Sequence, residues 1–256
     1  MTSFLMTSLK HFMQKREEEF KIKTYDCGVN GKIKISNLMQ YLQEIAANHA
    51  EALGFGFKAL NQLKGYWALS NIRIEIEKLP EWNERVIIRT WPSGHSRLLA
   101  MREFVGSNET GEGIFKASSE WMILDKVTTK PMNLMHLDLP LPKEEERVLS
   151  GEMKRLQPRS GYDFSGRQRV PYSAIDLNGH VNNTEYVKWA MDEIRRVCPA
   201  EFNVAAIQST YLSEVFEGDE VDIFLSRDSD DRMNAAIRKS GQDTDVFLMD
   251  VFLSLT

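Results

Sequence analysis

Hydrophobic and polar positions follow two periods along this chain, and both periods occur in each half. Apolar residues at helical spacing predict long helices over residues 36–53 and 182–197, and residues 54–65 predict a second, shorter helix in the first half. Runs rich in β-branched and aromatic residues, separated by Pro, Asn and Gly turn signals, predict strands. These strands are expected at residues 19–26, 66–79, 84–94, 97–106 and 113–125 in the first half, and at 167–173, 202–215, 219–228, 232–241 and 245–255 in the second.

The segment between the halves, from about residue 132 to 169, loses this periodicity and is rich in Pro, Gly, Ser and charge, which is typical of a linker. Each half then reads as a strand, a loop, a helix and a meander of long strands. The sequences VNGKI (29–33) and LNGHV (177–181) align their Asn-Gly pairs, and the following helices start in step. We interpret this as a duplication, although a single repeat pair is modest evidence.

The predicted fold class is therefore α+β, a tandem hotdog in which two antiparallel sheets are each wrapped around a central helix. The expected organisation is an N-terminal hotdog domain with its tail over residues 1–145, a linker over 146–167 and a C-terminal hotdog domain over 168–256.

Composition narrows the class of protein. The chain has 256 residues, 42% of them hydrophobic, and a net charge of -5, which argues against nucleic acid as a partner. No apolar run has the length of an integral membrane segment. The first 20 residues lack a signal-peptide pattern and suggest an amphipathic tail or partner helix. Two cysteines make no disulfide framework, so a reducing, cytoplasmic location is expected.

The candidate chemistry lies in DLNGHVNN, residues 176–183. Asn182 is a good helix N-cap, with Glu185 placed three residues on as in a capping box. The acid, amide and imidazole of Asp176, Asn178 and His180 thus lie just before a helix N-terminus, where free N–H groups gather. Such groups can attack a carbonyl and stabilise the oxyanion that forms.

The plainer interpretation of this stretch is a turn, a helix cap and a solvated histidine. Comparison of the two halves weighs against it. The matching positions of the first half hold Gly28, Asn30 and Lys32. The Asn-Gly turn is present in both copies, but only the second copy carries the acid and the imidazole, which indicates one active site in the second half.

At these residues the chain resembles a known family. DLNGHVNNTEYVKW is similar to the signature of the acyl-acyl carrier protein (acyl-ACP) thioesterases of plants and bacteria. Two further segments resemble that family, RTWPSGHSRLLAMREF with its Arg102–Glu103 pair and ASSEWMILDKVTTKP ending in Thr129–Lys130. The resemblance implies a tandem hotdog that hydrolyses fatty acyl thioesters of ACP to free fatty acid, with no metal or organic cofactor.

The resemblance also implies residue roles. The family's catalytic residues fall on Asp176, Asn178 and His180, and a downstream acid falls on Glu214 in YLSEV. The cysteine of that family pattern is replaced here by Val215.

For the substrate, the resemblance implies that the first domain sets acyl-chain length, and a long chain needs a narrow apolar tunnel. Met39 and Trp67 are the candidate substrate-binding residues. The implied partner is acidic acyl carrier protein, for which the linker region offers the basic side chains Lys154, Arg155, Arg159, Arg167 and Arg169, although an ordinary solvated linker would look the same. A tandem chain satisfies hotdog pairing internally, and a homodimer stays possible.

The expected mechanism is attack of water on the thioester, with Glu214 or Asp176 as general base. His180 would polarise the carbonyl, orient the water or protonate the leaving thiolate, and the alternative role of Asp176 is to fix the histidine tautomer. A carboxylate nucleophile and a Cys198–His180 pair are further options. Other functions left open are an acyl-CoA thioesterase, a hydroxyacyl dehydratase on the same fold, and a non-catalytic acyl-binding protein.

Overall fold

The computed structural model describes residues 15–141, 146–151, 153–198 and 202–255. The chain forms two compact units, one of Met1–Leu69 with Glu77–Gly151 and the other of Ser70–Ile76 with Glu152–Thr256. The tail or partner helix expected at the start of the chain lies largely outside the described residues. None of the helices in the described part of the chain combines the length and the apolar character that crossing a bilayer requires.

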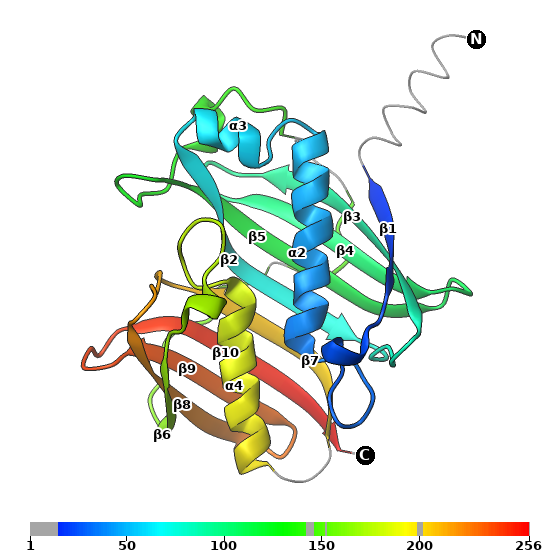
Figure 1. Ribbon diagram of the computed structural model, residues 1–256, viewed down its shortest axis with the longest axis vertical. Helices are drawn as coiled ribbons and strands as arrows, with labels where there is room; N and C mark the ends of the chain where they lie inside the picture. The colour runs from blue at the N-terminus through cyan, green and yellow to red at the C-terminus, as the bar shows by residue number, and fades with distance from the viewer. Residues whose placement is uncertain (1–14, 142–145, 152, 199–201, 256) are drawn as a thin grey trace. The chain divides into compact units, whose positions relative to one another are not determined.

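The first unit is an antiparallel sheet with one long helix against it (Figure 1). Its strands run in the order β1-β3-β4-β5-β2, and α2 contacts β1 and β3. The elements are β1 (Arg16–Lys21), α2 (Ile35–Ala52), α3 (Phe57–Gln62), β2 (Gly65–Ile76), β3 (Arg85–His95), β4 (Ala100–Asn108) and β5 (Gly113–Asp125), with 3-10 turns at Thr24–Asp26 and Leu134–His136.

The second unit repeats this plan. Its strands run in the order β7-β10-β9-β8-β6, and residues 71–75 at the end of β2 pair with β7. The helix α4 contacts β6, β8, β9 and β10. The elements are β6 (Asp163–Arg169), a 3-10 turn at Tyr172–Ala174, α4 (Asn183–Val197), β7 (Phe202–Tyr211), β8 (Glu220–Ser229), β9 (Arg232–Lys239) and β10 (Asp245–Leu255).

These elements confirm the predicted α+β tandem hotdog, and the shorter helix predicted at residues 54–65 is α3. In each unit the apolar stripe of the helix is buried against the sheet. Ile45 of α2 and Val187, Ala190 and Ile194 of α4 have no exposed surface. Full burial of a valine or isoleucine side chain contributes about 1.5–3 kcal/mol, so the helix–sheet contact stabilises each unit.

Several predicted boundaries differ in the structure. The strand predicted over 19–26 is β1, which ends at Lys21, and residues 24–26 form a 3-10 turn instead. Residues 163–167, assigned to the linker, form the start of β6 because they pair with β8, and Arg167 contacts Asp222 across that pair. The strand predicted over 167–173 stops before Pro171, which cannot donate to a ladder and leads into a 3-10 turn. The strand β7 ends at Tyr211, so Glu214 lies in the following loop.

The pairing of β4 with β5 contains a close approach that only glycine allows. Gly106 lies opposite Phe115, and a Cβ at position 106 would overlap the phenyl ring, which is 1% exposed. We predict that Gly106→Ala lowers the free energy of unfolding by about 1–3 kcal/mol, because the ring cannot retreat in a packed core. Chemical denaturation measures this loss.

Gly113→Ala on the same hairpin is the matched control, since its nearest atoms are Glu77 oxygens at 3.9 and 4.0 Å. Equal stability of the two variants would contradict the packing argument.

Candidate active site

A short hairpin loop carries Asp176, Asn178 and His180 to the start of α4. The Asp176 N–H donates to His180 O at 2.8 Å, and the Gly179 N–H donates to Asp176 O at 3.0 Å. Gly179 has a φ of 83°, the left-handed conformation that closes a three-residue hairpin loop and that glycine adopts without strain. The loop is therefore held by its backbone.

The carboxylate of Asp176 adds two bonds inside this loop. Its Oδ1 accepts the N–H of Asn178 at 2.8 Å and the N–H of His180 at 3.4 Å. Asp176 thus points back into the loop, where it fixes the direction in which Asn178 and His180 leave the backbone.

The first unit forms the same loop without an acid. The Gly28 N–H donates to Lys32 O at 2.9 Å, the Gly31 N–H donates to Gly28 O at 3.0 Å, and Gly31 has a φ of 74°. Isolated bridges flank both loops, Cys27–Ile33 in the first and Ile175–Val181 in the second. The turn therefore does not require a carboxylate, and the His180 imidazole is not part of the bonds that close it.

The two asparagines of the loops differ in how they are used. In the first copy Asn30 Oδ1 accepts the Lys32 N–H at 3.1 Å. In the second copy Asn178 Oδ1 is buried, and no group among the described residues donates to it. A buried acceptor without a donor is costly, which indicates a place for a water molecule or a ligand.

His180 and Glu214, far apart in the sequence, come together. His180 Nδ1 lies 3.4 Å from Glu214 Oε1, and the two side chains are 18% and 22% exposed. The Val181 N–H donates to Val215 O at 3.0 Å, which ties the hairpin loop to the segment that carries Glu214. The imidazole also packs edge-on against Phe216, with 5.1 Å between ring centroids.

The start of α4 lies directly after these groups. The Asn182 side chain accepts the Thr184 N–H at 3.0 Å, which confirms the predicted N-cap. The carboxylate of Glu185 contacts Lys188 at 3.2 Å, and the Asn182 N–H donates to Ala174 O, so the second bond of the capping box is replaced. The other N–H groups of the first turn and the helix dipole give this end partial positive charge. Tyr186 is 3% exposed, and burial raises the pKa of its hydroxyl, so it stays protonated and is no general base.

The cysteines lie elsewhere. Cys198 caps the C-terminus of α4, about 22 Å of helix away from the His180 end, so the option of a Cys198–His180 pair is wrong. Val215, in the place of the family cysteine, is fully buried.

Comparison with known proteins agrees with this architecture. The model of the acyl-ACP thioesterase N-terminal domain matches residues 13–136, and the model of the C-terminal domain matches residues 160–246. The chain belongs to the acyl-ACP thioesterase family. The two matched segments coincide with the two repeats of the fold.

Individual members of the family are distant relatives. The chain is 26% identical to oleoyl-acyl carrier protein thioesterase 1, chloroplastic, of Arabidopsis thaliana, over 84% of this chain and 64% of that protein. It is 28% identical to the palmitoyl-acyl carrier protein thioesterase, chloroplastic, of Gossypium hirsutum, over 77% and 51%. The chain thus spans roughly half to two thirds of the length of these relatives.

A solved acyl-ACP thioesterase from Bacteroides thetaiotaomicron superposes with a TM-score of 0.84. The superposition covers 94% of this chain and 98% of that structure at 24% identity, which supports the fold.

The first unit of this thioesterase-family chain contains an apolar cavity of about 120 Å³. Trp67 lines it, and its indole N–H donates to Phe55 O at 2.9 Å. Met39 is 1% exposed and is not among the lining residues. Small side chains of α2, including Ala46 and Ala50, leave the space open.

The cavity also has a polar wall residue that the sequence analysis noted only as part of a family segment. Arg102 lines the cavity and is 6% exposed. The sequence pattern that could have identified it is the alternation in β4, where Ala100 and Phe104 lie two residues away on either side. This alternation places the cation of Arg102 on an apolar face of the strand.

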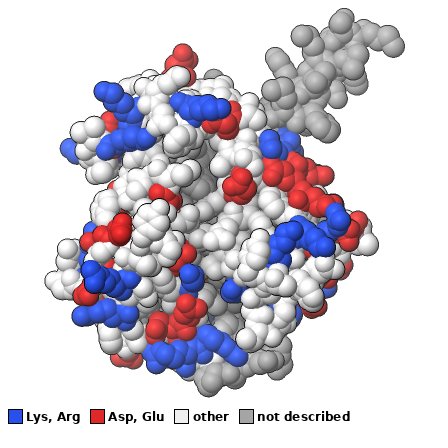
Figure 2. Space-filling view, in the orientation of Figure 1, with Lys and Arg blue, Asp and Glu red and all other residues white. Residues whose placement is uncertain are grey.

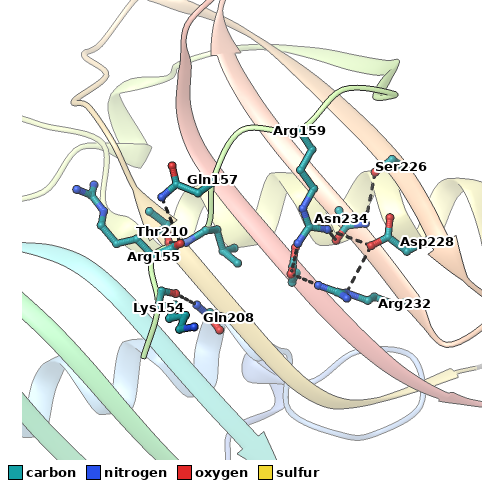
Figure 3. Close-up of polar contacts among 12 residues, drawn as sticks. Lys154, Arg155, Gln157, Arg159, Gln208, Thr210, Ser226, Asp228, Arg232 and Asn234 are labelled. Carbon is teal, nitrogen blue, oxygen red and sulfur yellow. Dashed lines mark hydrogen bonds and ion pairs between the residues drawn. The ribbon is translucent and has the colours of Figure 1, made fainter. Parts of the chain in front are cut away.

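The linker region crosses the sheet of the second unit (Figure 3). Gln208 Nε2 donates to Lys154 O at 2.5 Å, and the Arg155 guanidinium donates to Tyr211 O at 3.1 Å. Arg159 is bound by Asn234, Asp228 and Asp250 at 2.8–3.1 Å. A polar groove lies along this segment; its lining includes Arg73, Lys154, Arg155, Gln157, Arg159 and Gln208.

The basic residues expected to bind a partner are therefore not equivalent. Arg159 and Arg167 are paired with aspartates, whereas the exposed side chains of Lys154, Arg155 and Arg169 have no aspartate partner among the described residues. On the face drawn in Figure 2, basic and acidic side chains are intermixed rather than gathered into one strongly basic field.

The two asparagines provide a test of the site. We predict that Asn178→Ala leaves the free energy of unfolding unchanged or raises it, because it removes a buried acceptor that lacks a donor. Asn30→Ala, at the same position of the other loop, should lower it by about 0.5–1 kcal/mol, because a hydrogen bond is lost. Urea denaturation of both variants and the wild type measures these free energies of unfolding. A larger decrease for Asn178→Ala than for Asn30→Ala would contradict the conclusion that Asn178 Oδ1 has no structural role.

Proposed function

We propose that this protein hydrolyses fatty acyl thioesters of acyl carrier protein, releasing free fatty acid and the carrier thiol. One observation carries the proposal: the second of two equivalent loops brings His180 against Glu214 at the start of α4, while the first loop, built on the same backbone bonds, holds Gly28 and Lys32 instead. Membership of the acyl-ACP thioesterase family supports the same reaction class.

In the proposed reaction His180 is the base. His180 Nδ1–H faces Glu214 Oε1, the acceptor, across the 3.4 Å separation, and this tautomer gives Nε2 the lone pair that takes a proton from water. Bonds of this kind are often long before substrate binds. Water attacks the carbonyl carbon, the tetrahedral intermediate collapses, and imidazolium Nε2 returns the proton to the departing thiolate.

Asn178 and Asp176 take supporting roles in this scheme. The unpartnered Asn178 Oδ1 is an acceptor for the second proton of the attacking water, which would orient its lone pair toward the carbonyl. Asp176 already accepts two backbone N–H groups, so it acts as a positioning residue, and Glu214 is the acid that works with the histidine.

The developing oxyanion would be stabilised at the N-terminus of α4. N–H groups that lack partners within the helix, together with the helix dipole, favour negative charge there. No thiol takes part in this scheme, so Val215 in place of the family cysteine does not weaken it. No cofactor is required either, because every proton transfer uses a side chain or water.

We further propose that the carrier protein docks along the exposed linker residues. Lys154 and Arg155 have no aspartate partner in the described part of the chain and lie beside the end of β7, the strand that leads to Glu214. An acidic carrier would gain mainly in association rate from such residues. A reducing cytoplasmic location and the possible homodimer stay predictions.

The main test is thiol release from acyl-ACP and acyl-CoA series of increasing chain length. We predict that His180→Ala and Glu214→Gln each lower kcat about 10²–10⁴-fold, the usual contribution of general acid–base catalysis. Lys32→Ala, at the equivalent position of the first loop, is the matched control and should retain the wild-type rate.

Each other outcome selects an alternative. Faster release from acyl-CoA at every chain length would make the protein an acyl-CoA thioesterase. A double-bond product without thiol release would indicate a hydroxyacyl dehydratase. Binding of acyl chains with no turnover in the wild type would indicate a non-catalytic acyl-binding protein.

Docking is tested separately. We predict that the charge reversals Lys154→Glu and Arg155→Glu together raise KM for an acyl-ACP donor about tenfold or more at low salt, because they oppose an acidic partner. KM for a short acyl-pantetheine donor should not change. Lys116→Glu, an exposed lysine of the first unit, is the control. An equal effect on both donors would show a distorted active site instead of a docking surface.

A further inference from the structure

The wall of the first unit's cavity holds a buried guanidinium that has no carboxylate partner among the described residues. Arg102 is 6% exposed and lines the cavity. Its hydrogen bonds among the described residues are to Thr90 Oγ1 and His49 Nδ1, both at 3.2 Å. A buried charge is normally paired, because desolvation without compensation is expensive.

Both of these bonds use the same nitrogen, Nη1. The remaining donors, Nε–H and the adjacent Nη2–H, therefore have no acceptor among the described residues. These two N–H groups point in parallel along one edge of the guanidinium. That edge is the fork that binds both oxygens of a carboxylate.

The neighbouring acid does not supply the missing carboxylate. Glu103 follows Arg102 on β4, so the two side chains leave opposite faces of the sheet. Glu103 has its own partners: the hydroxyls of Ser93 (2.6 Å) and Ser118, and the Val148 N–H at 3.3 Å. Its carboxylate is thus occupied on the far side of the strand from the cavity.

The rest of the cavity suits an alkyl chain. Its lining includes the side chains of Ala46, Ala50, Phe55, Trp67 and Trp121. A cavity of about 150 Å³ holds a molecule of the size of benzene, so the 120 Å³ here encloses a carboxylate and the first few carbons of an alkyl chain, and the rest of a longer chain would extend through the open side of the cavity.

We propose that this cavity is a binding site for a carboxylate at the end of an alkyl chain, held by the Nε and Nη2 edge of Arg102. Two sources share this chemistry. One is a free fatty acid, which would enter with its carboxylate first and occupy the place of an acyl chain. The other is an acyl thioester whose far end carries a second carboxylate. The site rests on the geometry of the first unit and not on the proposed hydrolysis.

The charge state agrees with this assignment. Burial lowers the pKa of Arg102 to about 9, so the guanidinium is still protonated at neutral pH, where a fatty acid is ionised.

The first experiment measures binding without turnover. Isothermal titration at pH 7 compares hexanoate and octanoate, below their micelle-forming concentrations, with the alcohols of equal length. On the wild type and on His180→Ala we expect the acids to bind about tenfold or more tightly than the alcohols, as charge-assisted hydrogen bonds imply. On Arg102→Met the two ligand classes should bind within about twofold of each other.

Three further variants separate the guanidinium fork of Arg102 from its charge and from the space in the cavity. Arg102→Lys retains the charge but not the fork and should lose most of the preference. Ala50→Leu narrows the cavity and leaves Arg102 in place, so it should weaken acid and alcohol together. Arg97→Met, an exposed arginine of the same unit, should match the wild type. Equal binding of acids and alcohols by the wild type, no binding of either, or an acid preference that survives Arg102→Met would overturn the proposal.

The second arm separates the two sources and uses thiol release. If the site serves a distal carboxylate, thioesters of ω-carboxyacyl chains should show a lower KM than methyl-ended chains of equal length, and Arg102→Met should abolish the difference. If the site serves free acid, octanoate should inhibit release competitively in the wild type and about tenfold more weakly in Arg102→Met. If the wild-type protein releases no thiol from any donor, the proposed hydrolysis is contradicted. The titration would still decide whether the carboxylate site exists.

Discussion

The burial of one long helix against an antiparallel sheet, made once in each unit, is the contact on which the rest of the structure depends. Ile45 of α2 and Val187 of α4 have no exposed surface, and their neighbours along each stripe are similarly enclosed. A helix held in this way offers polar backbone groups only at its ends. The loop that enters the helix is therefore the natural place for chemistry on this fold, and both copies build the same loop there.

That loop separates folding from chemistry. Backbone bonds and a glycine with positive φ close it in both units, so the side chains at its other positions are free to differ. In the first unit Asn30 completes the loop by accepting a backbone N–H. In the second unit Asp176 accepts the backbone N–H groups, and the buried Oδ1 of Asn178 has no donor within the residues that the structure describes. A polar group released from structural duty in this way can serve a ligand or a water molecule.

Local signals in the sequence predicted much of this. Helical periodicity located α2 and α4 to within a residue, the strands at 113–125 and 245–255 matched β5 and β10, and Asn182 was identified as the N-cap. The 3.4 Å approach of Glu214 to His180 could not follow from local pattern, because it depends on where β7 leaves the sheet. Likewise, β6 is defined by long-range pairing, which its Ser- and Gly-containing sequence does not reveal.

The difference between the two units can be traced to side-chain volume as well as to charge. The helices start in step, 148 positions apart, so Ala46 and Ala50 of α2 correspond to Ile194 and Cys198 of α4. Ile194 is fully buried and fills its site, whereas the alanines of α2 border an open cavity. Since packed interiors seldom leave such space unfilled, a cavity kept open by small residues beside a buried Arg102 indicates a ligand. The second unit thus carries the reactive side chains at the start of α4, and the first unit contains a cavity beside the middle of α2.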